Sequence, residues 1–547
     1  MILRFLRISR VLFFAVLVAF FYAIVEVDAA HHSRDFESLF QCVELGDWRD
    51  ADFRCYERLR RNPNDVEALV AEARLKWYQG RRIEAVSYCD RALSVRPRCA
   101  LALYLRGALL SDIGKAEIGK YDLRLFLKMT DSEKDITTRN RRAHAFEYLN
   151  DSKNAKQETA AVLDGQISAT NDIDLLNRAF LQVNHGKLKE GVEALLSLRA
   201  KHPLAPFIRS NLAYCNVLNG KLDAALQEFA EVAKLAPTFS ANHTGWGFAL
   251  EKQRKYAPAI YQYSEAIKGD DFNSFAYQHR GLCYSETEEY SLALHDLNKA
   301  IRISPGNAYP LLNRAYVQNQ NGFFKEAVED CNRVIARNPK NATAWYQLAC
   351  AKADLQQFKE AKSASERALQ LSPNYLAALC KHASIIEEMG DRRTARADYD
   401  RAIQIDSKNS NAYFCRGLFF RDDKQYDRSI ADLNKAVELD PSDALKFCAR
   451  GCVEVRIQDY QKAIADCTKS IELNSRRAHP YFSRGEAYLA LQKYELAVND
   501  FTSAIHSYSQ YREAFERRAE AYKRMNKPAL AKQDLTRAKY LKPAGRS

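Results

Sequence analysis

Small, aromatic and charged residues recur along this chain at a fixed spacing of 34 residues. Three similar segments begin at Ala276, Ala412 and Pro480, and their starting points are 136 and 68 residues apart, both multiples of 34. The same register runs without a gap from residue 172 onward and defines eleven repeats. These begin at residues 172, 206, 240, 274, 308, 342, 376, 410, 444, 478 and 512. A period of this length indicates stacked structural repeats.

The places of the small residues predict two helices in each repeat. The eighth place is always Ala or Gly and the twentieth is always Ala, Gly or Ser, so two helix axes can approach closely there. Proline recurs where one repeat meets the next, as at Pro339 and Pro373, and ends the second helix. One helix pair cannot bury its apolar face alone, so we expect an all-α fold of stacked pairs.

Weaker repeats precede the eleven regular ones. Three begin at residues 32, 66 and 100, and residues 134–171 form a degenerate repeat, for which we expect an irregular helix pair or a longer loop. We therefore divide the chain into a leading segment (1–30), three N-terminal repeats (31–133), the degenerate repeat (134–171), eleven contiguous repeats (172–545) and a tail (546–547).

The residues at these places resemble the tetratricopeptide repeat. Trp345, Leu348 and Ala349 match the start of its pattern in one repeat. The remaining places are matched in another repeat by Gly485, Tyr488, Ala497, Phe501 and Ala504. Over residues 32–545 the resemblance implies a right-handed α-solenoid of about 15 stacked helix–turn–helix repeats. It also implies that the first helix of each repeat lines a concave groove, where other polypeptides bind.

Arginine in the seventh place often accompanies aspartate in the twenty-third. The pairs are Arg106/Asp122, Arg280/Asp296, Arg314/Asp330, Arg416/Asp432, Arg450/Asp466, Arg484/Asp500 and Arg518/Asp534. This co-occurrence predicts that the two side chains meet between helices, within about 5 Å, where an Arg–carboxylate fork fixes the helix register. A structural ladder is favoured over a ligand site.

The groove is the predicted place of function. By helical geometry and the precedent of the resemblance, the second, fifth, ninth, twelfth and thirteenth places of the first helix should face it. The candidates are Phe275, Gln278, Tyr309, Leu312, Tyr316, Tyr346, Phe414 and Phe482. Aromatic anchors with polar neighbours suit an extended peptide or a helix of a partner protein. For each ring, packing between adjacent first helices is the alternative.

The first 30 residues have the pattern of a targeting segment. Arg4, Arg7 and Arg10 precede an unbroken apolar run at residues 11–25, and Val27 and Ala29 occupy the two specificity places of a cleavage site. We expect a signal peptide, with an uncleaved membrane anchor as the alternative. The repeats would then be exported to a periplasm, a secretory lumen or the cell exterior, or held by a single span on the non-cytoplasmic side.

Charge adds one candidate surface. The 547 residues include 82 Lys and Arg and 69 Asp and Glu, a net charge of +13, and residues 512–547 hold eleven basic and four acidic residues, or +7 of that total. The centre of this basic patch is Arg517, Arg518, Lys523, Arg524 and Lys527. It is typical of a solvated helix face, and an anionic membrane surface is the alternative. We expect no nucleic-acid partner, and self-association through an uncapped last repeat stays open.

The sequence holds no motif for catalysis, so we expect no enzyme, no catalytic residue, no metal site and no cofactor. Four of the thirteen cysteines occupy the twenty-fourth place, where a packed hydrophobe is expected: Cys55, Cys89, Cys331 and Cys467. Cys448 and Cys452 lie four residues apart on one helix face predicted to line the groove. Cys350 and Cys380, in other repeats, are also predicted to face it. The alternative to a scaffold is therefore a thiol- or metal-dependent protein that uses Cys448 and Cys452.

Overall fold

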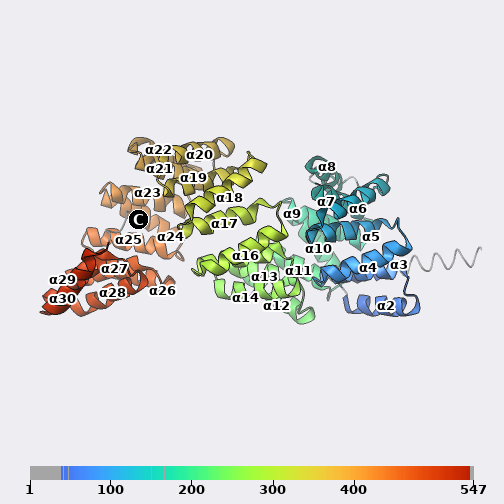
Figure 1. The fold of residues 1–547 in the computed structure, drawn as a ribbon, viewed down its shortest axis with the longest axis horizontal. Helices are drawn as coiled ribbons and strands as arrows, with labels where there is room; N and C mark the ends of the chain where they lie inside the picture. The colour runs from blue at the N-terminus through green and yellow to red at the C-terminus, as the bar shows by residue number, and fades with distance from the viewer. Residues whose placement is uncertain (1–38, 41, 47, 150, 166, 542–547) are drawn as a thin grey trace, which may run out of the picture. The chain divides into compact units, whose positions relative to one another are not determined.

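The protein is all-helical throughout the residues that the structure describes, which are 39–40, 42–46, 48–149, 151–165 and 167–541 of a computed structural model. The chain forms two compact units, Met1–Val317 (unit 1) and Gln318–Ser547 (unit 2). Within each unit, successive helices stack as antiparallel pairs (Figure 1). The expected helical solenoid is thus confirmed. The division of the repeats into residues 31–133, 134–171 and 172–545 rests on how well each repeat fits the sequence pattern. It stays a prediction.

Unit 1 contains helices α2 to α16. They are α2 (Trp48–Arg61), α3 (Val66–Tyr78), α4 (Arg82–Val95), α5 (Ala100–Asp112), α6 (Ala116–Met129), α7 (Ile136–Tyr148), α8 (Ser152–Leu163), α9 (Asp172–Asn184), α10 (Leu188–Lys201), α11 (Pro206–Leu218), α12 (Leu222–Leu235), α13 (Ser240–Lys252), α14 (Tyr256–Gly269), α15 (Ser274–Glu286) and α16 (Tyr290–Ile303). The division between the units falls inside α17 (Ala308–Gln320).

Unit 2 contains helices α18 to α30. They are α18 (Phe324–Arg337), α19 (Ala342–Asp354), α20 (Phe358–Leu371), α21 (Leu376–Glu388), α22 (Arg392–Ile405), α23 (Ser410–Asp422), α24 (Tyr426–Leu439), α25 (Ala444–Arg456), α26 (Tyr460–Leu473), α27 (Ala478–Ala490), α28 (Tyr494–Ser507), α29 (Arg512–Arg524) and α30 (Pro528–Lys539). From α9 onward, every odd-numbered helix begins at the first residue of a 34-residue repeat.

The glycines in the eighth place lie against a side chain of the second helix. A Cβ atom added to Gly485 would stand 2.8 Å from Cε1 of Phe501, and one added to Gly451 would stand 2.8 Å from Sγ of Cys467. Both partners occupy the twenty-fourth place and are fully buried. The eighth place is small because the two helices pack in contact there, which explains the pattern in the sequence.

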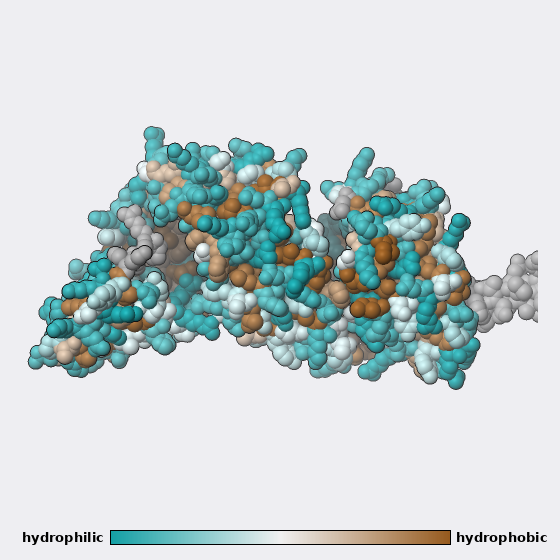
Figure 2. Space-filling view, in the orientation of Figure 1, coloured by the Kyte–Doolittle hydropathy of each residue, from teal (hydrophilic) through white to brown (hydrophobic). Residues whose placement is uncertain are grey.

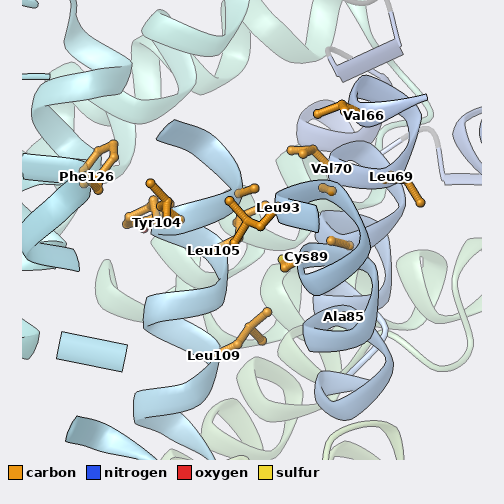
Figure 3. Packing of buried hydrophobic residues seen from close by; sticks show 14 of the residues in the cluster. Val66, Leu69, Val70, Ala85, Cys89, Leu93, Tyr104, Leu105, Leu109 and Phe126 are labelled. Carbon is orange, nitrogen blue, oxygen red and sulfur yellow. The ribbon is translucent and has the colours of Figure 1, made fainter. Parts of the chain in front are cut away.

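Stacking of neighbouring pairs makes a continuous core. Figure 3 shows part of it in the first repeats, where residues of the five successive helices α3 to α7 form one cluster. The cluster includes Leu69 and Val70 of α3, Cys89 and Leu93 of α4, and Leu105 and Leu109 of α5. Cys55, Cys89, Cys331 and Cys467 are all fully buried, as expected for packed thiols. Most of the molecular surface in view is hydrophilic, broken by hydrophobic patches (Figure 2).

The turn between the two helices of a repeat requires a left-handed residue. Gly80 has a φ of +75°, and Gln492 holds the same place in its repeat with a φ of 59°. The backbone N–H of Lys493 then donates to the carbonyl of Tyr488 at 2.8 Å, which closes a Schellman-type cap. This place takes Gly in some repeats and polar residues in others, so the sequence pattern did not reveal the constraint.

The degenerate repeat is an ordinary helix pair followed by a longer link. Its helices α7 and α8 are joined by an ion pair between Arg142 Nε and Glu158 Oε1 at 2.8 Å. The link from α8 to α9 covers residues 164–171, whereas the link from α12 to α13 covers only 236–239. Of the two expected irregularities, the lengthened loop is therefore the one that occurs.

Six of the seven predicted Arg–Asp pairs form forks in the described part of the chain. Both carboxylate oxygens of Asp500 accept hydrogen bonds from Arg484, each at 2.8 Å. The same fork joins Arg106 to Asp122, Arg280 to Asp296, Arg416 to Asp432, Arg450 to Asp466 and Arg518 to Asp534. The third nitrogen of Arg484 donates to Thr468 Oγ1 of the preceding repeat at 2.9 Å. Each fork therefore ties a helix pair together and also connects it to its neighbour.

The predicted leading segment, residues 1–30, lies outside the described residues. No helix within the described part of the chain has the length and apolar character needed to cross a membrane.

Removal of one member of a ladder pair is expected to destabilise the repeats around it. Asp500 is 8% exposed at its side chain, and the Asp500→Ala change leaves the guanidinium of Arg484 without its fork. We expect a loss of about 3 kcal/mol, because the remaining charge stays partly buried. Urea unfolding measures the loss, and hydrogen exchange of α27 and α28 localises it.

The matched control is Lys469→Ala, which breaks an exposed ion pair with Glu472 and should cost less than about 1 kcal/mol. Equal losses for the two variants would contradict a structural role for the ladder.

Candidate functional site

In unit 2, the first helices of three successive repeats, α19, α21 and α23, line a groove of about 940 Å³. Three successive repeats supply it with the residue in their fifth place, which is Tyr346 on α19, Cys380 on α21 and Phe414 on α23. The ninth places of α21 and α23 contribute Ser384 and Leu418. The helix face that geometry predicted for the concave wall is therefore the face that lines this groove.

Apolar and charged side chains occupy different parts of the groove. Tyr346, Phe414 and Leu418 lie along the middle of their helices, and the ring of Tyr346 packs on Tyr375 with centroids 5.2 Å apart. The charged residues come from the twelfth and thirteenth places, at the edge where the first helices end, and from the start of α22. They are Glu387, Glu388, Arg392, Arg421 and Asp422. An apolar wall with one charged edge suits a polypeptide that has both kinds of side chain.

Most charges at this edge are paired with one another. Arg392 Nη1 lies 3.2 Å from Glu387 Oε1, and Arg421 Nε lies 2.8 Å from Asp422 Oδ1. Burial raises the pKa of Glu387, against the opposing attraction of Arg392. Together with Lys381, the groove holds three cations and three carboxylates, so its net charge selects neither an acidic nor a basic ligand.

The other predicted groove residues are spread over different environments. Phe482 is half-buried against Phe501 and Tyr511, with ring centroids 5.7 and 4.9 Å away. Phe275 is 43% exposed and stacks on His279 with centroids 4.0 Å apart, and Tyr309 is 68% exposed.

Three of the candidates are packed into the protein. Tyr316 is half-buried beside Ala293 and Leu297. Gln278 is 8% exposed and Leu312 is 4% exposed, so their side chains belong to the packing, whereas the sequence analysis expected both to face the groove. Tyr346 and Phe414 are thus the predicted residues that share one groove.

The basic patch is partly neutralised by the repeats themselves. Arg518 belongs to the ladder through Asp534, and Arg517 Nη1 lies 2.9 Å from Glu520 Oε2. Lys523, Arg524 and Lys527 are exposed at the end of α29 and the turn that follows it. The structure therefore brings together fewer available cations than the sequence count suggests.

Two pairs of thiols lie among the groove-facing helices of unit 2. Each pair shifts the pKa of its members in opposite directions: the neighbouring thiol raises the pKa of Cys380 and Cys448 and lowers that of Cys415 and Cys452. The effect of the Cys448 thiol, which outweighs burial, and a hydrogen bond with Ser483 Oγ at 3.1 Å lower the pKa of Cys452 to about 7. All thirteen cysteines are free thiols. Within the described part of the chain, no group of three or more His, Cys, Asp or Glu side chains is placed to hold a metal ion.

A second pocket, of about 350 Å³, lies in unit 1. The two ends of unit 1 meet here, because Arg82 of α4 donates to both oxygens of Asp270, at 3.1 and 2.8 Å, across 188 residues of chain. Trp48 also packs edge-on against Phe239, with ring centroids 4.7 Å apart. Early and late repeats of unit 1 are therefore in direct contact beside this pocket.

The pocket in unit 1 is lined by buried charge. Arg74 Nε and Nη2 donate to the two oxygens of Glu44 at 3.0 and 3.2 Å, and Tyr78 donates its hydroxyl proton to the same carboxylate at 2.5 Å. Burial would raise the pKa of Glu44, but attraction to Arg74 and Arg141 and these hydrogen bonds outweigh it and lower the pKa. Arg74 occupies the ninth place of its repeat, which is one of the places expected to face the groove, so the sequence pattern could have identified it. Arg141 lies in the degenerate repeat, where the 34-residue register does not apply.

The thiol of Cys452 is expected to react at neutral pH. With its pKa near 7, a large fraction is thiolate there, and alkylation by iodoacetamide should reach half its maximal rate at a lower pH than for an ordinary cysteine. Peptide mass spectrometry of Cys452 over a range of pH measures this profile. Cys448→Ala removes the neighbouring thiol that lowers the pKa of Cys452 and should move the profile to higher pH, whereas Cys380→Ala should not. An unchanged profile in Cys448→Ala would refute the coupling.

Comparison with protein families finds matches within both units. Two descriptions of the tetratricopeptide repeat match, one at residues 276–307 and 342–375 and the other at 70–117, 176–238 and 381–444. The protein prenyltransferase alpha subunit repeat matches at residues 324–350. No curated protein matches the chain.

Among solved structures, the crystal structure of the APC/C hetero-tetramer Cut9-Hcn1 matches with 14% sequence identity, 88% of this chain and 94% of that chain covered, and a TM-score of 0.43. The family matches support the resemblance read from the sequence, since five stretches of the chain match descriptions of the tetratricopeptide repeat.

Proposed function

We propose that the protein is a non-catalytic scaffold that binds a partner polypeptide in the groove of unit 2. The observation that carries the proposal is the row of fifth-place residues, Tyr346, Cys380 and Phe414, which successive repeats place along one groove of about 940 Å³. A groove of this size with aromatic anchors fits several side chains of an extended peptide or one face of a helix.

Polar groups at the two edges of the groove would hold the backbone and fix the direction of the bound segment. Asn411 is exposed at the edge where the first helices begin, and an amide side chain can both donate to and accept from a peptide backbone. Lys381, Arg421 and Glu388 stand toward the opposite edge. The mixture of charges favours a ligand chosen by its pattern of side chains over one chosen by net charge.

The N-terminal pattern supports a location for this scaffold outside the cytoplasm or on a membrane. Arg4, Arg7 and Arg10 before the apolar run at residues 11–25 are the sequence features on which this part of the proposal depends.

Selection of peptides on the purified protein tests the groove. A random dodecapeptide phage library is panned on the wild type, and the Kd of the best synthetic peptides is measured by fluorescence polarisation. Phe414→Ala and Tyr346→Ala should each weaken binding about tenfold or more, because buried aromatic anchors carry most of the energy at such sites.

The matched control is Tyr540→Ala, which removes a ring that is 81% exposed at the end of α30, away from the groove. It should leave the Kd unchanged. Selected peptides that bind all three variants as tightly as the wild type would contradict the proposal.

A further inference from the structure

The pocket of unit 1 contains an arginine, Arg141, whose contacts in the described part of the chain are a long ion pair with Glu44 and the ring of Phe40, 5.4 Å from its Cζ. Arg141 lines the pocket with a side chain that is 19% exposed, and its guanidinium makes no hydrogen bond to any residue that the structure describes. The nearest described carboxylate oxygen is Glu44 Oε1, 3.9 Å from Nη2, which is beyond hydrogen-bond distance. Glu44 is already engaged by Arg74 and Tyr78.

The other acids beside the pocket are also committed elsewhere. Asp270 is bound by Arg82, and Asp112 accepts hydrogen bonds from both Arg82 and Tyr148. His144 is largely buried, and burial lowers its pKa, so it adds no positive charge at neutral pH. Burial together with repulsion from Arg74 lowers the pKa of Arg141 in spite of the attraction of Glu44. Keeping this guanidinium charged without a hydrogen-bonded acceptor costs stability.

A second polar group of the same pocket also lacks a partner. Asn140 precedes Arg141 on α7, and its amide nitrogen donates to Asn177 Oδ1 at 2.9 Å. Its oxygen Oδ1 is buried and accepts no hydrogen bond from the described residues. A buried acceptor beside a guanidinium that has no hydrogen-bonded acceptor is the complement of a ligand that brings both an anionic group and a hydrogen-bond donor.

We propose that this pocket binds a small organic anion: a carboxylate or phosphate group that pairs with Arg141, on a body whose hydroxyl or amino group donates to Asn140. The rings of Tyr78, Tyr104 and Phe207 line the same pocket and suit an aromatic or apolar body. A volume of about 350 Å³ lies at the small end of the range for small-molecule sites, which excludes a folded partner. This site is separate from the peptide groove of unit 2.

Binding of defined probes to the full chain tests the proposal. Isothermal titration calorimetry compares 4-hydroxybenzoate and 4-hydroxyphenyl phosphate with the uncharged 4-hydroxybenzamide. We expect at least one of the two anions to bind about tenfold or more tightly than the amide, because a charge-assisted fork to arginine is lost in the neutral probe. The anion that binds more tightly shows whether the pocket recognises a carboxylate or a phosphate group. Anions that bind no better than the amide would overturn the proposal.

The variant Arg141→Met separates a binding role from a structural one. Without ligand it should melt at or above the temperature of the wild type, because it removes a charge that burial disfavours, while anion binding falls about tenfold or more. The control Arg61→Gln removes an arginine on α2 that is 77% exposed and should change neither property. Undiminished anion binding in Arg141→Met, or a clearly lower melting temperature, would show that Arg141 serves the fold and would overturn the proposal.

The two sites can fail independently. Phe414→Ala in unit 2 should leave anion binding intact, so loss of the peptide groove and loss of the anion pocket are distinguishable results.

Discussion

The structure depends on one contact, which is made between a small residue in the eighth place of a repeat and the side chain in its twenty-fourth place. Gly485 under Phe501 and Gly451 under Cys467 show that the two helices touch at this point with no room for a larger residue. Close packing here fixes how the first helix is rotated against the second. Another side of the first helix, with the fifth and ninth places, is then left to form a concave wall.

The Arg–Asp forks hold the same two helices together through a second set of contacts. A fork such as that of Arg484 and Asp500 holds the two helices of one repeat in register, and its third nitrogen reaches the repeat before. Because each contact involves only near neighbours, the geometry of the array is built up step by step along the chain. The concave surfaces are consequences of these local contacts, and they differ between the units because the residues that face inward differ.

Local features were predictable from the sequence, since they follow from a fixed period. The starts of the first helices, the buried thiols such as Cys89 and the forks all obey the 34-residue register. The same rule placed Tyr346 and Phe414 in the groove. The same rule also selected Leu312, which is buried in the structure. Helical geometry predicts the direction in which a side chain points, but it does not predict which residues pack against that side chain.

Features that depend on the accumulated turn of many repeats were not predictable. The contact between Arg82 and Asp270 joins residues 188 positions apart, and no single repeat contains a sign of it. The pocket that this contact helps to bound therefore had no sequence signal, and its residue Arg141 lies where the register is broken. The left-handed turn residue was missed for a different reason, because places such as Gln492 tolerate several residue types in spite of a positive φ.

The central claim is that the first helices form most of the recognition surface, to which the second helix α22 adds Arg392, and that α20 and α24 only support it. Hydrogen–deuterium exchange of the protein with and without a groove-binding peptide tests it directly. The account predicts slower exchange in α19, α21 and α23 on binding, with no change in α20 and α24. Protection confined to α20 and α24, with α21 and α23 unaffected, would contradict it.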